Sequence, residues 1–460
     1  YLKQGKYAEA IPESSTVPAV SRPAPHYTNV AERLGLQFKH SGTAQDAEIR
    51  DILLGRPRSR AWFENTVNQS RLMAALGSGV AFCDYNNDGR LDLFLVNANG
   101  GCALYEQGSD GHFRDVTKNV GLGTQAQPGM ACAWGDYDND GWTDLLVTYY
   151  GAIQLYRNNR GRFQDVTVGA GLTKSISASA AYMGVAFADV DHDGDTDIYV
   201  TCLMDMNEMA PKTEVSFPND FRGQPNLLFR NNSNATFTEV AMQARADGGG
   251  YRTRNVWFGD VNDDRAVDFL LFDAENKPAT FLNNKDGTFS PASLTPANLP
   301  AALPFGESRA YGDFNGDGAV DELILQNGAR VVLNRNDSKP AHWLAVQLEG
   351  YAVPGKVKSN KLGIGTKVEV RSVGQWQQQE LRAGSGMMGS DAPVLYFDLG
   401  EQTQVDFVRA IFPSGVRWTL KDVRANQTIR LQEPLLDVNS CPTLFAWNGK
   451  QFEFVADTLS

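Results

Sequence analysis

Residues 84–92 read Asp-Tyr-Asn-Asn-Asp-Gly-Arg-Leu-Asp, an acidic loop with oxygen-bearing side chains at positions 1, 3, 5 and 9. This pattern surrounds a hard cation with oxygen ligands, and a backbone carbonyl at position 7 completes the set. Four more loops of this kind close with an Asp eight residues after the first, and they open at Asp136, Asp189, Asp260 and Asp313. The sequence therefore predicts five calcium loops, numbered 1 to 5 in chain order.

The loops lie inside longer repeats, because the first Asp recurs at intervals of 52, 53, 71 and 53 residues. An apolar segment precedes each loop and another follows it, as residues 79–83 and 91–96 do around loop 1. Two further strand-like segments complete a unit, and the last reads Phe-x-Asp-Val-Thr at residues 113–117 and 163–167. Four short strands per unit indicate an all-β, calcium-loop β-propeller with five evident blades. The scarcity of helical patterns excludes a βαβ fold, and a period of about 50 residues excludes a β-helix.

The candidate metal ligands are the residues at positions 1, 3, 5, 7 and 9 of each loop, the seventh acting through its carbonyl oxygen. They are Asp84, Asn86, Asp88, Arg90, Asp92, Asp136, Asp138, Asp140, Trp142, Asp144, Asp189, Asp191, Asp193, Asp195, Asp197, Asp260, Asn262, Asp264, Ala266, Asp268, Asp313, Asn315, Asp317, Ala319 and Asp321. Oxygen ligands on a flexible loop favour Ca²⁺ over Mg²⁺, which demands tighter octahedral geometry. Zinc is excluded because the five histidines are dispersed along the chain.

The five loops differ in charge, so we expect them to differ in affinity. Loops 2 and 3 carry four carboxylates each and are expected to bind Ca²⁺ most strongly. Loops 1 and 5 carry Asn86 and Asn315 at the third position, where a neutral oxygen attracts a cation less. Loop 4 combines Asn262 with Arg265, where the other loops have a glycine that supplies a left-handed turn. We therefore expect up to five bound ions and a weak or empty fourth site.

These repeats resemble the FG-GAP/VCBS repeats of integrin-α-like β-propellers over residues 27–335. Residues 343–433 resemble the ASPIC/UnbV domain, which follows such repeats in the cartilage acidic protein family and in bacterial tetratricopeptide-linked relatives. The matching stretches include residues 342–348, 363–370, 397–400, 412–415 and 426–429. The resemblance implies calcium within the blades and seven blades in total, two of them atypical and drawn in part from residues 40–76.

The chain divides into five predicted parts. Residues 1–11 resemble the first helix of a tetratricopeptide unit, and the Pro-rich residues 12–26 are typical of a linker. We expect the propeller over residues 27–340 and a β-sandwich-like ASPIC/UnbV domain over residues 341–434. Residues 435–460 begin a further β segment with a hairpin, so we infer that the chain is a portion of a larger polypeptide.

Composition limits the classes of function. The 460 residues are 42% hydrophobic with a net charge of -12, which disfavours a nucleic-acid partner. No stretch is long and apolar enough to predict direct membrane insertion. The five cysteines are too scattered for a disulfide framework, and Cys83 and Cys132 align with small apolar residues of the other repeats. We therefore expect these two cysteines in the core.

The sequence lacks recognisable catalytic motifs, so we expect no enzyme, no catalytic residue and no organic cofactor. Residues 384–389 match the spelling of a dinucleotide fingerprint, but the flanking strand, helix and downstream acid are missing. We interpret them as a glycine-rich turn. A nucleophile elbow and a His-Glu-x-x-His motif are also missing from the sequence.

Three classes of function remain open. The leading one is a calcium-stabilised extracellular or cell-surface binding or adhesion module with a protein or glycan partner, non-catalytic and secreted. The insertion at residues 204–224 is either an exposed contact patch or a loop folded over the ring. The first alternative is a self-associating structural subunit of a surface layer or extracellular filament. The second is a polysaccharide-active enzyme built on a propeller scaffold.

Overall fold

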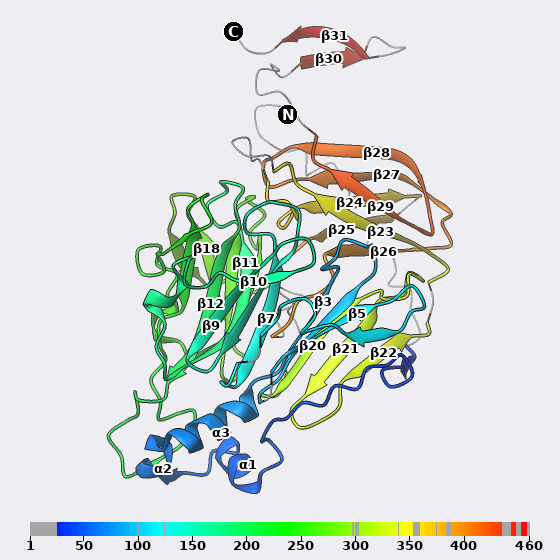
Figure 1. Cartoon of the computed structure of the whole chain (residues 1–460). Helices are drawn as coiled ribbons and strands as arrows, with labels where there is room; N and C mark the ends of the chain where they lie inside the picture. Colours follow the sequence, from blue (N-terminus) through cyan, green and yellow to red (C-terminus); the bar gives the residue numbers. More distant parts are fainter. Residues whose placement is uncertain are drawn as a thin grey trace.

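The computed structural model describes residues 25–434, apart from residues 100, 124, 297–298, 300–302, 339, 353–358, 374 and 383–387, together with two strands at 443–447 and 452–457. Almost all regular structure is β, as predicted. The sheets of the repeat region, here called the ring, lie in the middle of the molecule, with helices at one end and a second β domain at the other (Figure 1). The tetratricopeptide-type helix and most of the linker, residues 1–24, lie outside the described residues.

Five four-stranded antiparallel sheets, called blades 1 to 5, form the repeat region, one for each acidic loop. Blades 1 and 2 contain β3 (Gly79–Cys83), β4 (Asp92–Val96), β5 (Ala103–Gln107), β6 (Phe113–Asp115), β7 (Gly129–Gly135), β8 (Asp144–Tyr149), β9 (Ala152–Asn158) and β10 (Phe163–Asp165). Blades 3 and 4 contain β11 (Ala180–Ala188), β12 (Asp197–Asp205), β14 (Leu227–Asn231), β15 (Phe237–Glu239), β16 (Thr253–Gly259), β17 (Asp268–Asp273), β18 (Pro278–Asn283) and β19 (Phe289–Ala292). Among the described residues the repeats thus form five such sheets, not the seven that the resemblance implies.

Blade 5 is completed by the N-terminal strand. Its strands are β20 (Glu307–Gly312), β21 (Asp321–Gln326), β22 (Val332–Asn336) and β1 (Tyr27–Asn29). β1 pairs antiparallel with β22, with Tyr27 opposite Asn336. The two ends of the repeat region are therefore held in one sheet, which protects an edge that would otherwise be open.

The first strands of the blades line the inside of the ring. β20 contacts β3, β3 contacts β7, β7 contacts β11 and β11 contacts β16. In blades 1 to 4 the side chains of the first strand are buried on both faces, which explains the apolar runs before acidic loops 1 to 4. The first strand of blade 5 is only partly buried. Each acidic loop joins the first strand of its blade to the second.

Residues 40–76 form helices, so the prediction that they supply strands of an additional blade is wrong. The elements are α1 (Ala47–Leu53), α2 (Arg60–Glu64) and α3 (Thr66–Leu76), with the short strand β2 (Arg58–Ser59) between α1 and α2. Asp46 caps α1 and Asn65 caps α3, each accepting hydrogen bonds from the first turn. Helix α3 ends on Leu76, which is fully buried against the ring.

The insertion at residues 204–224 is folded against these helices rather than exposed as a patch. Met204, Met206, Phe217 and Phe221 are buried, and the Phe221 ring lies 5.3 Å from that of Phe63 in α2. The short strand β13 (Glu214–Val215) pairs with β2. Of the two expectations for this insertion, the folded loop is confirmed.

Two short 3-10 helices also lie between blades, at Leu172–Ser175 and Gly248–Gly250.

The C-terminal domain is a two-sheet β structure, as predicted. One sheet contains β23 (His342–Glu349), β26 (Val394–Gly400) and β29 (Gln427–Gln432), and the other contains β24 (Lys367–Ser372), β25 (Gln375–Glu380), β27 (Gln404–Ile411) and β28 (Arg417–Arg424). Side chains from both sheets, such as Val346 and Val408, share one core. The hairpin strands β30 (Thr443–Trp447) and β31 (Phe452–Asp457) pair antiparallel, which confirms the predicted hairpin.

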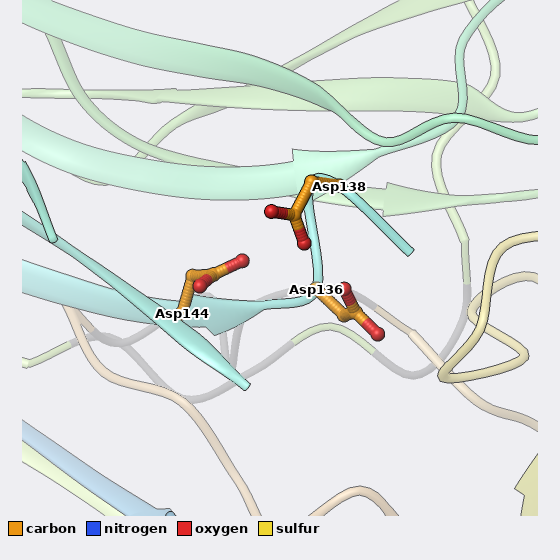
Figure 2. Close-up of side chains that lie close together, drawn as sticks. All are labelled: Asp136, Asp138 and Asp144. Atoms are coloured by element: carbon orange, nitrogen blue, oxygen red, sulfur yellow. The ribbon is translucent and has the colours of Figure 1, made fainter. Parts of the chain in front are cut away.

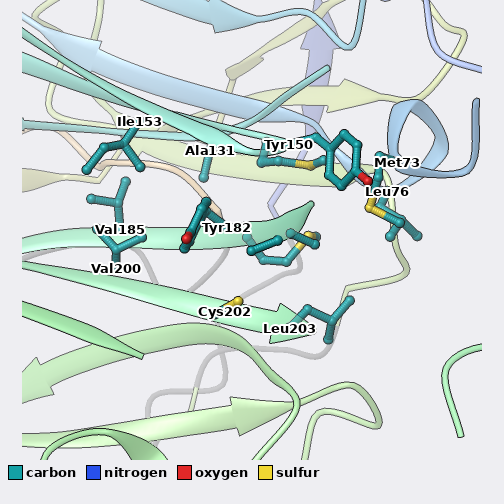
Figure 3. Packing of buried hydrophobic residues seen from close by; sticks show 14 of the residues in the cluster. Met73, Leu76, Ala131, Tyr150, Ile153, Tyr182, Val185, Val200, Cys202 and Leu203 are labelled. Atoms are coloured by element: carbon teal, nitrogen blue, oxygen red, sulfur yellow. The ribbon is translucent and has the colours of Figure 1, made fainter. Parts of the chain in front are cut away.

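The largest core cluster runs from the helices to the inner strands of blades 2 and 3 (Figure 3). Met73 of α3, Tyr150 of blade 2 and Leu203 of blade 3 pack in it together. Met388 of the C-terminal domain joins the same cluster. Cys83 and Cys132 are free and buried in a neighbouring cluster, which confirms the prediction that they are core residues.

Candidate metal centres

All five acidic loops share one backbone conformation. The residues at positions 4 and 6 have positive φ in every loop, and they are Asn87, Gly89, Asn139, Gly141, His192, Gly194, Asp263, Arg265, Gly316 and Gly318. Arg265 has a φ of 72°, close to the values of 84° to 90° at the corresponding glycines of the other loops. The predicted left-handed turn at position 6 is therefore present, and in loop 4 a bulky side chain adopts it at an energetic cost.

Backbone amides fix the first and ninth carboxylates of the loops. In loop 2, Asp136 accepts hydrogen bonds from the amides of Asp140 and Gly141, at 3.0 and 2.8 Å. Asp144 accepts one from Tyr137 at 3.1 Å and one from Asn158 at 2.7 Å, in the third strand of the blade. The ninth Asp of the other loops, namely Asp92, Asp197, Asp268 and Asp321, makes the same two contacts. This residue holds the blade together in addition to facing the loop.

Loops 2 and 3 each bring three carboxylates together. Ligand oxygens of Asp136, Asp138 and Asp144 lie within 4.8 Å of one another (Figure 2). Asp189, Asp191 and Asp197 form the equivalent group in loop 3. These are the two loops for which the sequence predicts the strongest binding, and their donor set consists entirely of oxygen.

The carboxylates of loops 2 and 3 include buried oxygens without a partner. Asp189 Oδ1 and Asp138 Oδ1 accept no hydrogen bond. An unpartnered buried acceptor costs about 1–3 kcal/mol, so a bound cation would relieve these groups. Arg157 Nε lies 2.7 Å from Asp138 Oδ2 and compensates part of the charge in loop 2. Among the described residues, no lysine or arginine pairs with the acids of loop 3 in this way.

Burial and mutual repulsion raise the pKa of several loop carboxyls. Burial, together with the charges of Asp193 and Asp191, raises the pKa of Asp189 to about 8. Burial likewise raises the pKa of Asp136 to about 7 and that of Asp92 to about 8. Without a cation these acids therefore resist ionisation near neutral pH.

In loops 1, 4 and 5 the asparagine at the third position donates a hydrogen bond to the fifth-position Asp. This bond partly compensates the negative charge that a cation would otherwise neutralise. In loop 1, Asn86 Nδ2 donates to Asp88 Oδ2 at 3.1 Å. Asn262 and Asn315 make the same bond to the fifth-position Asp of loops 4 and 5. An Asp at the third position has no hydrogen to donate when ionised, which explains why only loops 2 and 3 leave Asp138 and Asp191 outside such a pair.

The seventh-position residues are arranged differently from one loop to the next. In loop 3 the Asp195 side chain accepts a hydrogen bond of 2.7 Å from Asn139 of loop 2 and another from Ser233. In loop 1 the Arg90 guanidinium pairs with Asp88. The backbone amides of Arg90, Trp142, Asp195, Ala266 and Ala319 all donate to the fifth-position Asp of their own loop. Sequence reasoning assigned these positions only a carbonyl ligand and did not anticipate the side-chain links between loops.

The C-terminal domain covers the face of the ring on which the acidic loops lie. The Lys361 amide donates to Asn139 of loop 2 at 3.0 Å, and the Asp313 amide of loop 5 donates to Tyr396 Oη at 3.2 Å. Trp343 packs so closely on Gly318 that a Cβ there would lie 2.2 Å from its ring. Nothing in the spacing of the loops signals this contact, because it joins segments far apart in sequence.

A cavity of about 340 Å³ lies between the ring and the C-terminal domain. It is lined by Trp257, Tyr311, Glu380, Asp391 and Tyr396, among others. Asp391 accepts a hydrogen bond from the Tyr311 amide at 2.8 Å. Of the glycine-rich residues 384–389, only Met388 and Gly389 are described, and Ser390 after them pairs with β3 as a strand rather than opening a helix.

Family models match both parts of this architecture. The FG-GAP-like repeat matches residues 84–147, 136–200 and 260–324, which contain all five loops, and the model named ASPIC and UnbV matches residues 355–435. The chain carries FG-GAP-like repeats and an ASPIC and UnbV domain. The resemblance predicted from the sequence is therefore confirmed. None of the helices among the described residues combines the length and apolar character needed to cross a bilayer.

One curated relative is cartilage acidic protein 1 of Xenopus tropicalis, 27% identical over 128 residues. The match covers 27% of this chain and 19% of that protein, so it spans about a fifth of the relative's length. Most of that protein therefore lies outside the match.

Solved structures with partial similarity include two lectins and a matrix protein. BP39L lectin from Burkholderia pseudomallei is 13% identical with a TM-score of 0.34, covering 76% of this chain and 96% of the lectin. A lectin from Agrocybe aegerita, which recognises non-reducing terminal N-acetylglucosamine, is 16% identical with a TM-score of 0.30, covering 59% of this chain and 66% of its own. The biofilm matrix protein Bap1 of V. cholerae is 12% identical with a TM-score of 0.27. The match covers 87% of this chain and 63% of Bap1. Scores this low carry no argument about the ligand.

Proposed function

We propose that this chain is an extracellular binding module, non-catalytic, whose ring is stabilised by Ca²⁺ held in its acidic loops. The observation that carries the proposal is the group formed by Asp189, Asp191 and Asp197, whose ligand oxygens lie within 4.8 Å. A buried oxygen of Asp189 lacks any hydrogen-bond partner in this group. Three carboxylates at this spacing repel one another, so a divalent cation bound here contributes directly to folding.

The residues of the loops fit calcium unequally. Loop 3 offers the best fit, because Asp189 and Asp197 are buried and, among the described residues, no lysine or arginine forms an ion pair with its acids. Loop 2 follows, with Arg157 beside Asp138. Loops 1 and 5 each retain three carboxylates and one asparagine oxygen, which suits the weak affinities, Kd about 10⁻⁴ to 10⁻³ M, of extracellular calcium modules. An extracellular location is part of the proposal, because calcium is available there at such concentrations.

Calorimetric titration of metal-free chain with calcium tests the proposal. We expect binding with saturation below millimolar concentration for at least two sites, and a rise in melting temperature that Mg²⁺ at the same concentration does not reproduce. Equal effects of the two ions, or no heat and no change in melting temperature, would contradict a calcium-stabilised ring.

The proposed ligand is a glycan or protein, and the cavity beside Trp257 and Asp391 is the concave site that suits a small sugar unit. Its volume of about 340 Å³ is in the range of small-molecule sites, and it combines aromatic faces with a carboxylate. A glycan array in calcium and in chelator tests this part. Binding without turnover supports a binding module, whereas release of labelled fragments from a polysaccharide would show an enzyme.

A further inference from the structure

Loop 4 holds a lysine of the other domain among its acids. Lys367 begins β24 in the C-terminal domain, and its Nζ lies 2.8 Å from Asp260 Oδ2 and 2.5 Å from Asp263 Oδ1. The side chains of Lys367 and Asp260 are 15% and 5% exposed. Both are therefore largely removed from water, unlike an ordinary surface ion pair.

The same carboxylate is already saturated by hydrogen bonds. Asp260 Oδ1 accepts from the Asp264 amide at 3.0 Å, and Oδ2 accepts from the Arg265 amide at 2.7 Å as well as from Lys367. A second ammonium group, that of Lys285, lies 3.4 Å from Asp264 Oδ2 and donates to the Asp264 carbonyl. Two positive charges at this loop oppose a divalent cation, so the residues of loop 4 do not fit calcium.

Among the described residues, the glycine at the end of the first strand of blade 4 does not face a following blade. In blades 2 and 5 the glycine that ends the first strand packs on the next blade: Gly135 faces Phe187, and Gly312 faces Phe82 as well as Ala392 of the C-terminal domain. Gly259 in blade 4 instead faces Glu380 and Arg382 of the C-terminal domain. The Arg382 guanidinium lies 4.4 Å over the Trp257 ring, and Glu380 accepts a hydrogen bond from the Asp260 amide.

We propose that loop 4 is a docking point for the C-terminal domain, in which the Lys367 ammonium takes the place proposed for calcium in loops 2 and 3. Glu380 and Arg382 supply the surface that a following blade supplies elsewhere in the ring. The domain is thus held on blade 4 by an internal cation. Its attachment at this point does not depend on calcium, whatever the metal content of loops 2 and 3.

Hydrogen–deuterium exchange with and without calcium tests the docking. Removal of the ammonium in Lys367→Met leaves Asp260 buried and uncompensated, so we expect exchange of peptides over residues 253–268 and 375–382 to rise about tenfold in both conditions. The matched control is Lys361→Met, whose Nζ pairs with Glu349 inside its own domain and which is expected to leave these peptides unchanged. Lys367→Arg retains the charge and is expected to retain most of the protection. Unchanged exchange in Lys367→Met would overturn the proposal.

The number of bound calcium ions provides a second readout. Because loop 4 carries lysine instead of metal, Asp260→Asn is expected to leave the calorimetric stoichiometry of the full chain unchanged. Asp189→Asn is expected to lower it by one, since it removes a ligand from loop 3. Loss of one site in Asp260→Asn would overturn the inference. An unchanged number in Asp189→Asn would contradict calcium in loop 3, while the exchange experiment still decides the docking.

Discussion

The side-chain Nδ2 of Asn158 in blade 2 donates a hydrogen bond of 2.8 Å to the carbonyl oxygen of Tyr85 in blade 1. The bond connects the end of a third strand to the second residue of the neighbouring acidic loop. It recurs from Asn231 to Tyr137, from Asn283 to Val190 and, with a longer side chain, from Gln107 to Phe314. Four such bonds join blades 5, 1, 2, 3 and 4 in that order.

The junction between blades 4 and 5 is different. Asn336, at the corresponding position of blade 5, donates to Val320 of its own blade at 3.2 Å. Among the residues that the structure describes, it makes no bond to loop 4. The C-terminal domain contacts both sides of this junction, through Glu380 at loop 4 and Tyr396 at loop 5. The ring and the second domain therefore form one structural unit.

Substitution of Asn158 tests the importance of the bond between blades. Asn158→Ala removes the donor to the buried carbonyl of Tyr85 and to the partly buried carbonyl of Thr143. We expect a loss of about 2–3 kcal/mol in the free energy of unfolding, measured by urea denaturation. Asn336→Ala is the matched control, expected to cost about 1 kcal/mol because its amide bridges no blades. Equal losses would show that the link between blades adds nothing beyond a local hydrogen bond.

The left-handed conformation of Arg265 in loop 4 predicts that a glycine at this position makes the chain more stable. Arg265 has a φ of 72°, a region that costs a residue with a side chain about 1–2 kcal/mol. Arg265→Gly is therefore expected to raise the free energy of unfolding of metal-free chain by about 1 kcal/mol, allowing for the greater unfolded-state entropy of glycine. The reverse change, Gly89→Ala in loop 1, has open space for its Cβ and is expected to cost about 1 kcal/mol through φ alone. A destabilised Arg265→Gly would mean that the Arg265 side chain makes a compensating interaction.

The acidic loops were predictable because their chemistry is local. Each residue from Asp136 to Asp144 acts within nine positions, so spacing alone determines which carboxylates meet. The left-handed turn at Arg265 was predictable for the same reason. The Lys367 contact was not, because it depends on how two domains pack across 107 positions. Residues 40–76 were wrongly predicted to belong to a blade because the resemblance implies seven blades. The capping residues Asp46 and Asn65 were the local signal for helices in this segment.

The stability of the metal-free chain is expected to fall as the pH rises. The pKa of Asp92 is raised to about 8 and that of Asp321 to about 7, mainly by burial, against an ordinary value of 3.8. The folded state therefore binds more protons than the unfolded state across this window, so stability falls as pH rises from about 4 to about 8. Urea denaturation in chelator is expected to give a lower midpoint at about pH 8 than at about pH 5. Calcium reverses the trend, because its ligands must be deprotonated. A midpoint in chelator that rises with pH would contradict the assigned shifts.

The ranking of the loops by calcium affinity is tested by substituting one acid in loop 3 and one in loop 4. Asp191→Ala removes a ligand from the three-carboxylate group, so its cost is expected only when metal is bound. At a calcium concentration of about 100 times Kd a bound ion contributes about 2.7 kcal/mol, and the melting temperature of this variant should fall in calcium while staying near wild type in chelator. Asp264→Ala instead removes hydrogen bonds from Asn262 and Ala266 and the pair with Lys285, which are present with or without metal. Its smaller loss is expected to be the same in both conditions. A calcium-dependent loss in Asp264→Ala, or an equal loss for Asp191→Ala in chelator, would reverse the order of the two loops.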